Sequence, residues 1–505
     1  MTLSAPRHWP LFAAALGAVA CASVPSTVGP ASASFPPVSD TSIFAPLTIP
    51  PAPSVTRLAN GAPGPKFWQN RADYDLQATL DTVANTLQGS MRLRYTNNSP
   101  NTLDILWFQT EQNRLRPDSA NPPSDTSKAH PYGDVIDQFT EVVDGKPVAV
   151  QLEDHKAETK VTLPASIKPG ATVTLQVAWH FLIPPSTRPL GRRMGRQKSL
   201  YEIAQWYPRL NVYDDVKGWN TEPYLGPGEF YLEYGDFTFA VTVPSNEIVA
   251  ATGTLDNPND VLTPTEIARL KQAMTVDTTV HIATAEELTN GSAHLKHDGM
   301  VTWKFHANNV RDAVWCASPQ YIWDATHWKG ILAQAFYRPN AASLWSEAAD
   351  MARMSIQEYS ERWYPYPYPQ VTAAEGQVHG MEYPMLSMDG GAQTPQDLYG
   401  VITHETGHNW FPMIVGSNER MHGWMDEGFN TFINTFSEAR RYPSEGDQTA
   451  RADQDRAAIE SAMTQHQDVA MDGPVNELPN NGYSSYTKPG GVLQLLRRDV
   501  IGPAV

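Results

Sequence analysis

His404, Glu405 and His408 stand in the order His-Glu-Thr-Gly-His, so the two histidines are four residues apart. In a helix, side chains four residues apart project from one face, and two imidazoles placed in this way can bind one metal ion. Such nitrogen ligands suit Zn²⁺, which keeps one position for water in a catalytic site. Glu405 lies about 100° around the helix from His404 and can reach that water without binding the metal. The spacing predicts a zinc site with Glu405 as its general base.

A third ligand is expected at Glu427, 19 residues after His408. Two antiparallel helices joined by a loop over residues 412–423 would bring Glu427 against the histidine pair. Two histidines and one glutamate make an open, catalytic zinc site. We expect Asp426 to complement the dipole at the start of the second helix, which leaves Glu427 free to bind the metal.

Local signals predict the helices that position these residues. The stretch Thr394-Pro395-Gln396-Asp397 supplies an N-cap, a first-turn proline and an acid. That helix should run to about Phe411, because Pro412 has no N–H for the carbonyl of residue 408. Apolar residues spaced i, i+3, i+4 and i+7 over 429–436 predict a second helix that ends near Pro443.

The spacing of apolar residues changes along the chain. From about 67 to 317 it has mostly period two, as in 91–95 and 237–243, which predicts half-buried antiparallel strands interrupted by one helix from 264 to 274. After about 318 the period shifts towards 3.6, beginning with an apolar stripe over 344–359. We therefore expect an α+β, multidomain chain with a β domain over 67–317 and a mostly helical domain over 318–505.

Composition narrows the class of protein. The 505 residues include 37 Lys+Arg and 54 Asp+Glu, for a formal net charge of −17. This balance argues against nucleic acid as a partner and against electrostatic attraction to anionic membranes. Cys21 and Cys316 are the only cysteines, too few for a disulfide scaffold. We expect Cys316 to be a buried apolar thiol.

The N-terminus resembles an export signal. An apolar run over 11–22 has the length of a signal core, and no segment reaches the roughly 20 apolar residues of a membrane helix. Cleavage after Ala20 would leave Cys21 at the new N-terminus for a lipid anchor, whereas Ala20-Cys21-Ala22 is itself an alternative cleavage site. Residues 1–22 are thus expected to be a signal peptide, and the Pro/Ser-rich residues 23–66 a tether. The mature protein is expected to be periplasmic or at the cell surface.

Four motifs together resemble the aminopeptidase N family of zinc metallopeptidases, the gluzincins that include leukotriene hydrolase. They are HETGHNW at 404–410, WMDEGFNTF at 424–432, Gly380-Met381-Glu382-Tyr383, and Tyr486-Thr487-Lys488-Pro489-Gly490. The resemblance covers roughly 68–505. It implies a β-saddle domain before a thermolysin-like catalytic domain that binds one zinc through His404, His408 and Glu427.

The resemblance also implies a catalytic tyrosine. Tyr486 would donate a hydrogen bond to the oxyanion of the tetrahedral intermediate, an interaction that is strongest in the transition state. Pro489 interrupts the family's Tyr-x-Lys-Gly pattern, so Tyr483 stays open as the alternative. Only 19 residues follow Tyr486, so the chain is expected to be a C-terminally truncated form of the family.

By the same resemblance, Glu382, together with Gly380 and Met381, would bind a peptide substrate, with Glu382 pairing with the free α-ammonium. This pairing fixes the scissile bond one residue from the charged end. Tyr383 stands where the family has Asn. Gln205, in AQWYPR, is the residue that the β domain would contribute to the amine site.

Three functions stay open on the sequence. The first is an aminopeptidase, and the second is a zinc endopeptidase or another zinc hydrolase without an amine anchor, for which Tyr383 is the motivation. The third is a surface-tethered binding protein with a structural metal. The preferred substrate residue, the physiological peptide and the oligomeric state are not specified by the sequence.

Overall fold

The computed structural model describes residues 53–119, 132–185, 194–295, 299–443 and 448–502. The predicted signal peptide with Cys21, and the tether up to residue 52, lie outside these ranges. Where the tether is described, Arg57 forms an ion pair with Asp215, with 2.6 Å between Nη2 and Oδ1. Within the described ranges, no helix combines the length and the apolar character needed to cross a bilayer.

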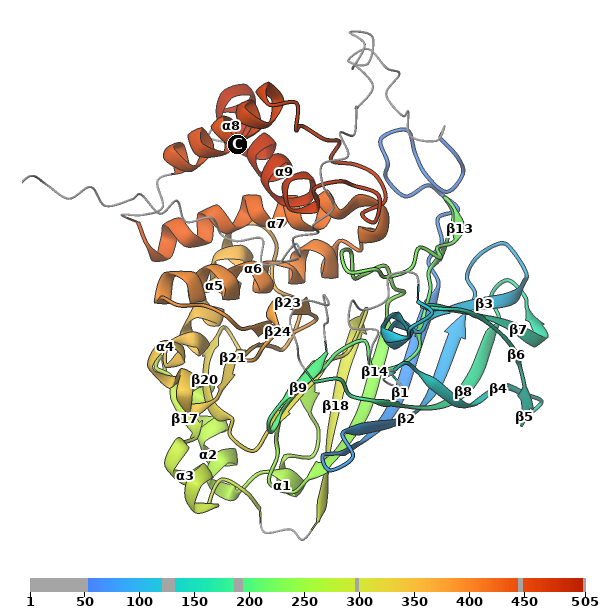
Figure 1. Ribbon diagram of the computed structural model, residues 1–505, viewed down its shortest axis with the longest axis horizontal. Coiled ribbons are helices and arrows are strands. Elements are labelled where there is room, and N and C mark those ends of the chain that lie inside the picture. The colour runs from blue at the N-terminus through green and yellow to red at the C-terminus, as the bar shows by residue number, and fades with distance from the viewer. Residues whose placement is uncertain (1–52, 120–131, 186–193, 296–298, 444–447, 503–505) are drawn as a thin grey trace, which may run out of the picture.

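An eight-stranded sheet dominates the first half of the chain (Figure 1), with the order β16-β18-β14-β1-β2-β8-β4-β5. The predicted period of two is confirmed: in β2, Met91, Leu93 and Tyr95 are buried and their neighbours face solvent. Neighbouring strands are antiparallel, except that β1 pairs with β14 in parallel. The strands are β1 (Arg71–Asp81), β2 (Thr86–Thr96), β4 (Val135–Val143), β5 (Lys146–Ala149), β8 (Thr172–Leu182), β14 (Gly235–Pro244), β16 (Thr254–Leu255) and β18 (Met300–Val310).

Three smaller sheets complete this β-rich part, with the orders β11-β3-β7-β6, β15-β19-β10-β9 and β12-β13. Their strands are β3 (Leu103–Gln109), β6 (Gln151–His155), β7 (Glu158–Ile167), β9 (Gly195–Gln197), β10 (Leu200–Ile203), β11 (Arg209–Leu210), β12 (Tyr213–Asp214), β13 (Gly218–Trp219), β15 (Ile248–Ala251) and β19 (Trp315–Ser318). Cys316 in β19 is a buried free thiol, as predicted. The predicted helix is α2 (Pro264–Ala273), which begins with a capping box at Thr263 and lies between the short α1 (Pro258–Val261) and α3 (Ala285–Asn290).

A six-stranded sheet with the order β17-β20-β21-β22-β24-β23 supports the helices of the second half. The sequence pattern predicted no strands after 318, because short apolar runs within a helical region do not reveal their period. Its strands are β17 (Val280–Ala283), β20 (Ile322–Trp328), β21 (Ile331–Tyr337), β22 (Gln370–Ala374), β23 (His379–Tyr383) and β24 (Leu386–Asp389). Strand β23 lies at the edge of the sheet.

Figure 1 shows the helices α5, α6 and α7 stacked over this sheet, with α8 and α9 beyond α7. The helices of this part are α4 (Ala342–Trp345), α5 (Ala348–Arg362), α6 (Pro395–Gly407), α7 (Glu419–Arg441), α8 (Gln448–Thr464) and α9 (Lys488–Leu495). The α+β, multidomain class, with a sheet-rich first half and a helical second half, is thus confirmed. The exact boundaries at 22, 66 and 317 stay predictions.

Two predicted helix limits agree with the backbone conformation. Helix α6 ends at Gly407 and a π-helical turn, Asn409–Ile414, follows it, so the helical backbone is first interrupted at Phe411 (φ −127°, ψ 106°), the residue before Pro412. Helix α7 (Glu419–Arg441) is two helical segments joined across a break at His422 (φ −139°, ψ 54°), so its main segment starts after His422, close to the predicted end of the loop at residue 423. Its end at Arg441 agrees with the predicted stop near Pro443.

Candidate metal centre

Helix α6 begins as its sequence predicts and is fixed in place by α7. The Thr394 hydroxyl accepts a hydrogen bond from the N–H of Asp397, whose carboxylate accepts the Thr394 N–H in return. At the other end, Asn430 of α7 donates to the carbonyl of His404 at 2.8 Å. A Cβ on Gly407 would lie only 2.1 Å from the Asn430 side-chain oxygen, so a glycine is needed for this approach of the two helices. The last turn of α6 is therefore held against α7.

The structure brings His404, His408 and Glu427 together. The two Nε2 atoms are 3.1 Å apart, and Glu427 Oε2 lies 3.2 Å from that of His404 and 3.4 Å from that of His408. A tetrahedral zinc ion with ligands at 2.0–2.1 Å would separate them by about 3.3–3.4 Å. The buried Glu427 Oε2 has no hydrogen-bond partner in the described part of the chain. The donor set and its spacing fit Zn²⁺.

Each histidine is oriented through its other ring nitrogen. Nδ1 of His404 lies 2.7 Å from Asn434 Oδ1, and Nδ1 of His408 lies 2.6 Å from Asp426 Oδ1 and 2.7 Å from the Phe411 carbonyl. Asn434 Oδ1 accepts the Nδ1 proton of His404 and the Phe411 carbonyl accepts that of His408, so each Nε2 presents a lone pair to the metal. Asp426 lies near the start of the helical segment that follows the break at His422, and its carboxylate also lies against the His408 ring.

Glu405 is buried beside the metal ligands and has an oxygen, Oε2, without a hydrogen-bond partner within the described ranges. Burial raises the pKa of Glu405 well above its ordinary value, and the nearby His408 opposes this shift. A bound divalent cation would act in the same direction as His408 and would lower the pKa of Glu405. Gly380 of β23 approaches the same carboxylate with φ +80°, and a Cβ there would lie 2.6 Å from Glu405 Oε1.

Glu382 lies in strand β23, and it is 4% exposed. Its Oε1 is 4.0 Å from Nδ1 of His408 and has no hydrogen-bond partner among the described residues. Burial raises the pKa of Glu382 well above its usual value. Met381 and Tyr383 are buried on either side of it, and the Tyr383 ring packs edge-on against Phe230, with centroids 5.2 Å apart.

The two candidate tyrosines lie in different places. The hydroxyl of Tyr486 donates to Glu427 Oε1, and its ring stacks on His404 with centroids 6.1 Å apart. The hydroxyl of Tyr483 donates instead to Asp468 at 3.0 Å. Burial raises the pKa of Tyr486 well above its usual value, so its phenol keeps its proton near neutral pH. Tyr486 is the tyrosine at the metal ligands.

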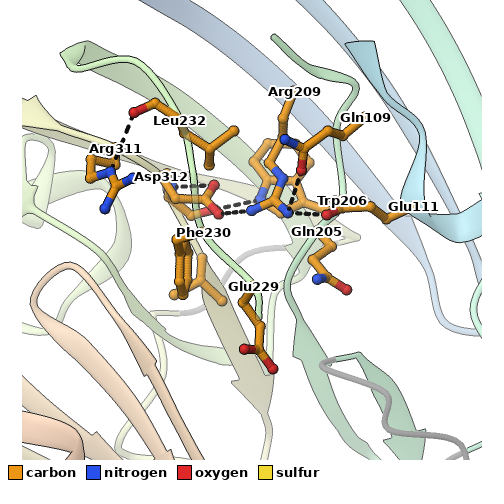
Figure 2. A network of polar contacts seen from close by, with 12 residues as sticks. Gln109, Glu111, Gln205, Trp206, Arg209, Glu229, Phe230, Leu232, Arg311 and Asp312 are labelled. Atoms are coloured by element: carbon orange, nitrogen blue, oxygen red, sulfur yellow. Dashed lines mark hydrogen bonds and ion pairs between the residues drawn. The ribbon is translucent and has the colours of Figure 1, made fainter. Parts of the chain in front are cut away.

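Gln205 follows strand β10 in a left-handed conformation (φ +50°), and it is not brought into the metal cluster itself. Its buried Nε2 has no hydrogen-bond partner within the described ranges, while its carbonyl accepts from Gln112 at 2.7 Å. Figure 2 shows its side chain and that of Glu229 extending away from the buried Arg209. A strained backbone and an unsatisfied amide are typical of a residue that is held for binding.

A buried ion network ties the β-rich part to helix α7 (Figure 2). The fully buried guanidinium of Arg209 donates to Asp312, Glu111 and Gln109. Arg420 of α7 donates to the same Gln109 at 3.0 Å and to Glu111 at 3.2 Å. Because Arg420 lies seven residues before Glu427, the network fixes the metal-binding helix relative to the segment of Gln205.

Sequence reasoning missed three further residues near the cluster, Asn434, Glu229 and Glu419. It also missed the contact between Asp426 and His408. Asn434 lies seven residues after Glu427 in α7, a helical spacing that could have indicated it. No local pattern indicates Glu229 or Glu419. These two, with Glu382, each bring one carboxylate oxygen within 4.8 Å of the others.

Comparisons with known proteins agree with the motifs. No family model matches the sequence. Over 121 residues the sequence is 26% identical to aminopeptidase N of Plutella xylostella, a match that covers 21% of this chain and 13% of that protein. The chain therefore aligns with only a small part of that relative's length.

Solved structures with similarity to this chain include the M1 zinc metallopeptidase from Deinococcus radiodurans. Its TM-score is 0.49 at 16% identity, covering 77% of this chain and 74% of that chain. A mutant of that enzyme bound to a Tyr-Ser-Ala substrate also gives 0.49 and 16%, covering 78% and 76%. By its motifs, its order of β-rich and helical parts and the matched stretch of sequence, the chain resembles the aminopeptidase N family of zinc metallopeptidases.

Proposed function

We propose that the chain is a zinc metallopeptidase and, more narrowly, an aminopeptidase that removes N-terminal residues from peptides. The observation that supports this most directly is the convergence of Nε2 of His404, Nε2 of His408 and Oε2 of Glu427, all within 3.4 Å. The unpaired oxygen of Glu382 lies beside this cluster. An open metal site next to a buried carboxylate suits a substrate whose charged end is one residue from the scissile bond.

The roles of the protein side chains follow from their positions. Zinc, when bound by these three ligands, supplies Lewis-acid activation of a water and of the scissile carbonyl. Glu405 accepts the proton of the attacking water and then delivers it to the leaving amine. Tyr486 holds its proton and donates a hydrogen bond where negative charge develops on the carbonyl oxygen. Glu382 binds the α-ammonium.

The strand arrangement supports an extended peptide as the substrate. Strand β23 lies at the edge of its sheet, so Gly380 and Met381 can present main-chain groups to a peptide in the manner of an added strand. We keep Gln205 in the proposed amine site on the family resemblance alone, with its side-chain oxygen as the acceptor for the α-ammonium. We include export to the periplasm or cell surface in the proposal, on the apolar run over 11–22 alone.

The test compares wild type with Glu405→Gln on aminoacyl amides and on their N-acetylated counterparts, with zinc measured by elemental analysis. Loss of a general base costs about 10²–10⁴-fold in rate, and zinc should stay near one per chain. Equal cleavage of free and acetylated substrates would indicate an endopeptidase or another hydrolase without an amine anchor. Unchanged activity in Glu405→Gln would indicate that the metal is structural.

A further inference from the structure

Glu202 is a buried glutamate of the β-rich part that lies outside the metal cluster. It belongs to β10, where it is 1% exposed and is paired with Cys316 of β19. Burial of a carboxyl group costs free energy unless its oxygens are hydrogen-bonded. The nearby cation, Arg338, is bound by another carboxylate, with 2.6 Å between its Nη2 and Glu375 Oε1. The other contacts of Glu202 therefore indicate its role.

Both carboxyl oxygens of Glu202 bind the main chain that precedes strand β23. Oε1 accepts the N–H groups of Gln377 and Val378, each at 3.1 Å, and Oε2 accepts that of Gln377 at 3.0 Å. A Cβ on Gly376 would lie 2.0 Å from Glu202 Oε1, so a glycine is needed for this approach. Because 175 residues separate Glu202 from Gln377, the contact joins the β-rich part to the six-stranded sheet.

The bound segment leads directly into an irregular part of β23. Between His379 and Glu382, the pairing of β23 with β24 shifts in register. Three residue steps in β23 match two in β24 there, so Gly380 and Met381 lie in a bulge. A bulge leaves a residue without a ladder partner, so the position of its main chain depends on how the strand enters it.

Glu202 fixes the main chain just before this bulge. The N–H of Val378 is bound by Glu202, and its carbonyl accepts the N–H of Gly390 at 2.8 Å. A Cβ on Gly390 would lie only 2.7 Å from that carbonyl, so this side is closely packed as well. The strand therefore reaches Gly380, two residues further on, from a point that is held on both sides.

We propose that Glu202 is a positioning residue, which sets where the main chain of Gly380 and Met381 meets a peptide substrate. The inference rests on the proposed peptidase function and adds to it a residue of the β-rich part that no motif indicates. Glu382 lies beyond the bulge and is paired with Ser387 of β24, so its place depends less on Glu202. Glu202 thus acts on the main-chain contacts of the substrate rather than on its α-ammonium.

The test compares two substrates that share the α-ammonium but differ in the main chain beyond the scissile bond. They are an unblocked aminoacyl amide, which has none, and an unblocked tripeptide, which can lie along β23. Misplacement of a positioning element by about 1 Å costs about 10²-fold. We expect Glu202→Met to lower kcat/KM for the tripeptide by about 10- to 100-fold, chiefly through KM, because the lost contacts already bind the peptide in the ground state. The aminoacyl amide should lose at most a few-fold, and the zinc content should stay unchanged.

Glu266→Met is the matched control. Glu266 is 2% exposed and also binds a main-chain N–H, that of Thr263 at 2.7 Å, but it lies in α2, which Figure 1 shows far from α6 and α7. This substitution should lower Tm without changing the ratio of the two kcat/KM values. Glu202→Gln keeps one acceptor oxygen at the same reach, so it should give a smaller fall in the ratio. It provides the test if Glu202→Met does not fold.

The outcomes separate this inference from the aminopeptidase proposal. If the Glu202 variants lower kcat/KM for both substrates by the same factor, Glu202 only stabilises the fold and the inference is wrong. If the ratio falls as expected but wild type cleaves free and acetylated tripeptides equally, the positioning role stands and the aminopeptidase proposal is wrong. If Glu382→Gln removes the preference for free substrates while Glu202→Met leaves the ratio unchanged, the aminopeptidase proposal stands and the inference is wrong.

Discussion

The support of His404 by Asn434 allows a quantitative prediction about metal affinity. Asn434 Oδ1, at 2.7 Å, is the hydrogen-bond acceptor that the described residues offer to Nδ1 of His404. The amide is itself oriented, because its Nδ2 donates to the Tyr359 hydroxyl at 2.9 Å. Asn434→Ala removes this acceptor, so the His404 ring loses both its fixed tautomer and its orientation.

Loss of such an outer partner typically weakens metal binding by about 10- to 100-fold, or about 1.4–2.8 kcal/mol. We expect this loss in competition titrations with a chromophoric zinc chelator, with kcat at saturating zinc changed far less than the affinity. Asp426→Asn is the comparison variant. It keeps an oxygen near His408, and the Phe411 carbonyl still accepts from the same Nδ1 at 2.7 Å, so zinc affinity should fall by only a few-fold.

The reverse order would refute this reasoning. If Asn434→Ala bound zinc as tightly as wild type while Asp426→Asn lost it, the ring of His404 would be held by packing rather than by its hydrogen bond. A thermal melt of each apoprotein separates a weaker site from a less stable fold.

Three other results are expected. Arg209→Met leaves the buried Asp312 without its cation and leaves Glu111 paired with Arg420 alone. This change costs about 3–5 kcal/mol and should lower Tm by about 3–5 °C in a chain of this size, whereas the exposed Arg92→Met should shift Tm by less than about 1 °C. Burial raises the pKa of Glu202 from 4.5 to about 7, so its contribution to stability is fully present below pH 4.5 and is lost as pH rises through 7. Urea titrations should show Glu202→Gln gaining about 3 kcal/mol relative to wild type between pH 4.5 and pH 8, and a constant difference would contradict this. Tyr486→Phe should lower kcat by about 10²–10³-fold in a steady-state assay with zinc retained, and Tyr483→Phe should leave it nearly unchanged.

The sequence predicts best what is decided within one or two helical turns. His404, Glu405 and His408 could be assigned because their geometry follows from the four-residue spacing in a capped helix. The alternating strands such as β14 follow in the same way from period two. Glu427 was predicted from two antiparallel helices joined by a loop, but its distance to the histidines depends on how α7 packs against α6, which the sequence alone does not specify.

The rest depends on contacts between segments far apart in the chain. Glu229 lies beside Glu382 and Glu419, which are far from it in the sequence, and the carboxylate of Glu419, 190 residues later, binds its main chain. Strand β23 was not predicted, because His379–Tyr383 is too short and too mixed in composition to show a period of two. The break before Pro412 follows from the proline, but the π-helical turn Asn409–Ile414 that spans it could not be predicted from the sequence.

Gly380 lies so close to Glu405 that a side chain at this position would affect the general base directly. At φ +80° and with its missing Cβ 2.6 Å from the general base, this position admits no side chain without moving the carboxylate of Glu405. A methyl group at this position of the strand that would receive the peptide would therefore clash with the carboxylate that would activate the water. For natural variation, this position tolerates hardly any change. For protein engineering, Gly380→Ala is a way to disarm the base while every metal ligand stays in place, which would allow substrate complexes to be trapped with native metal-binding chemistry.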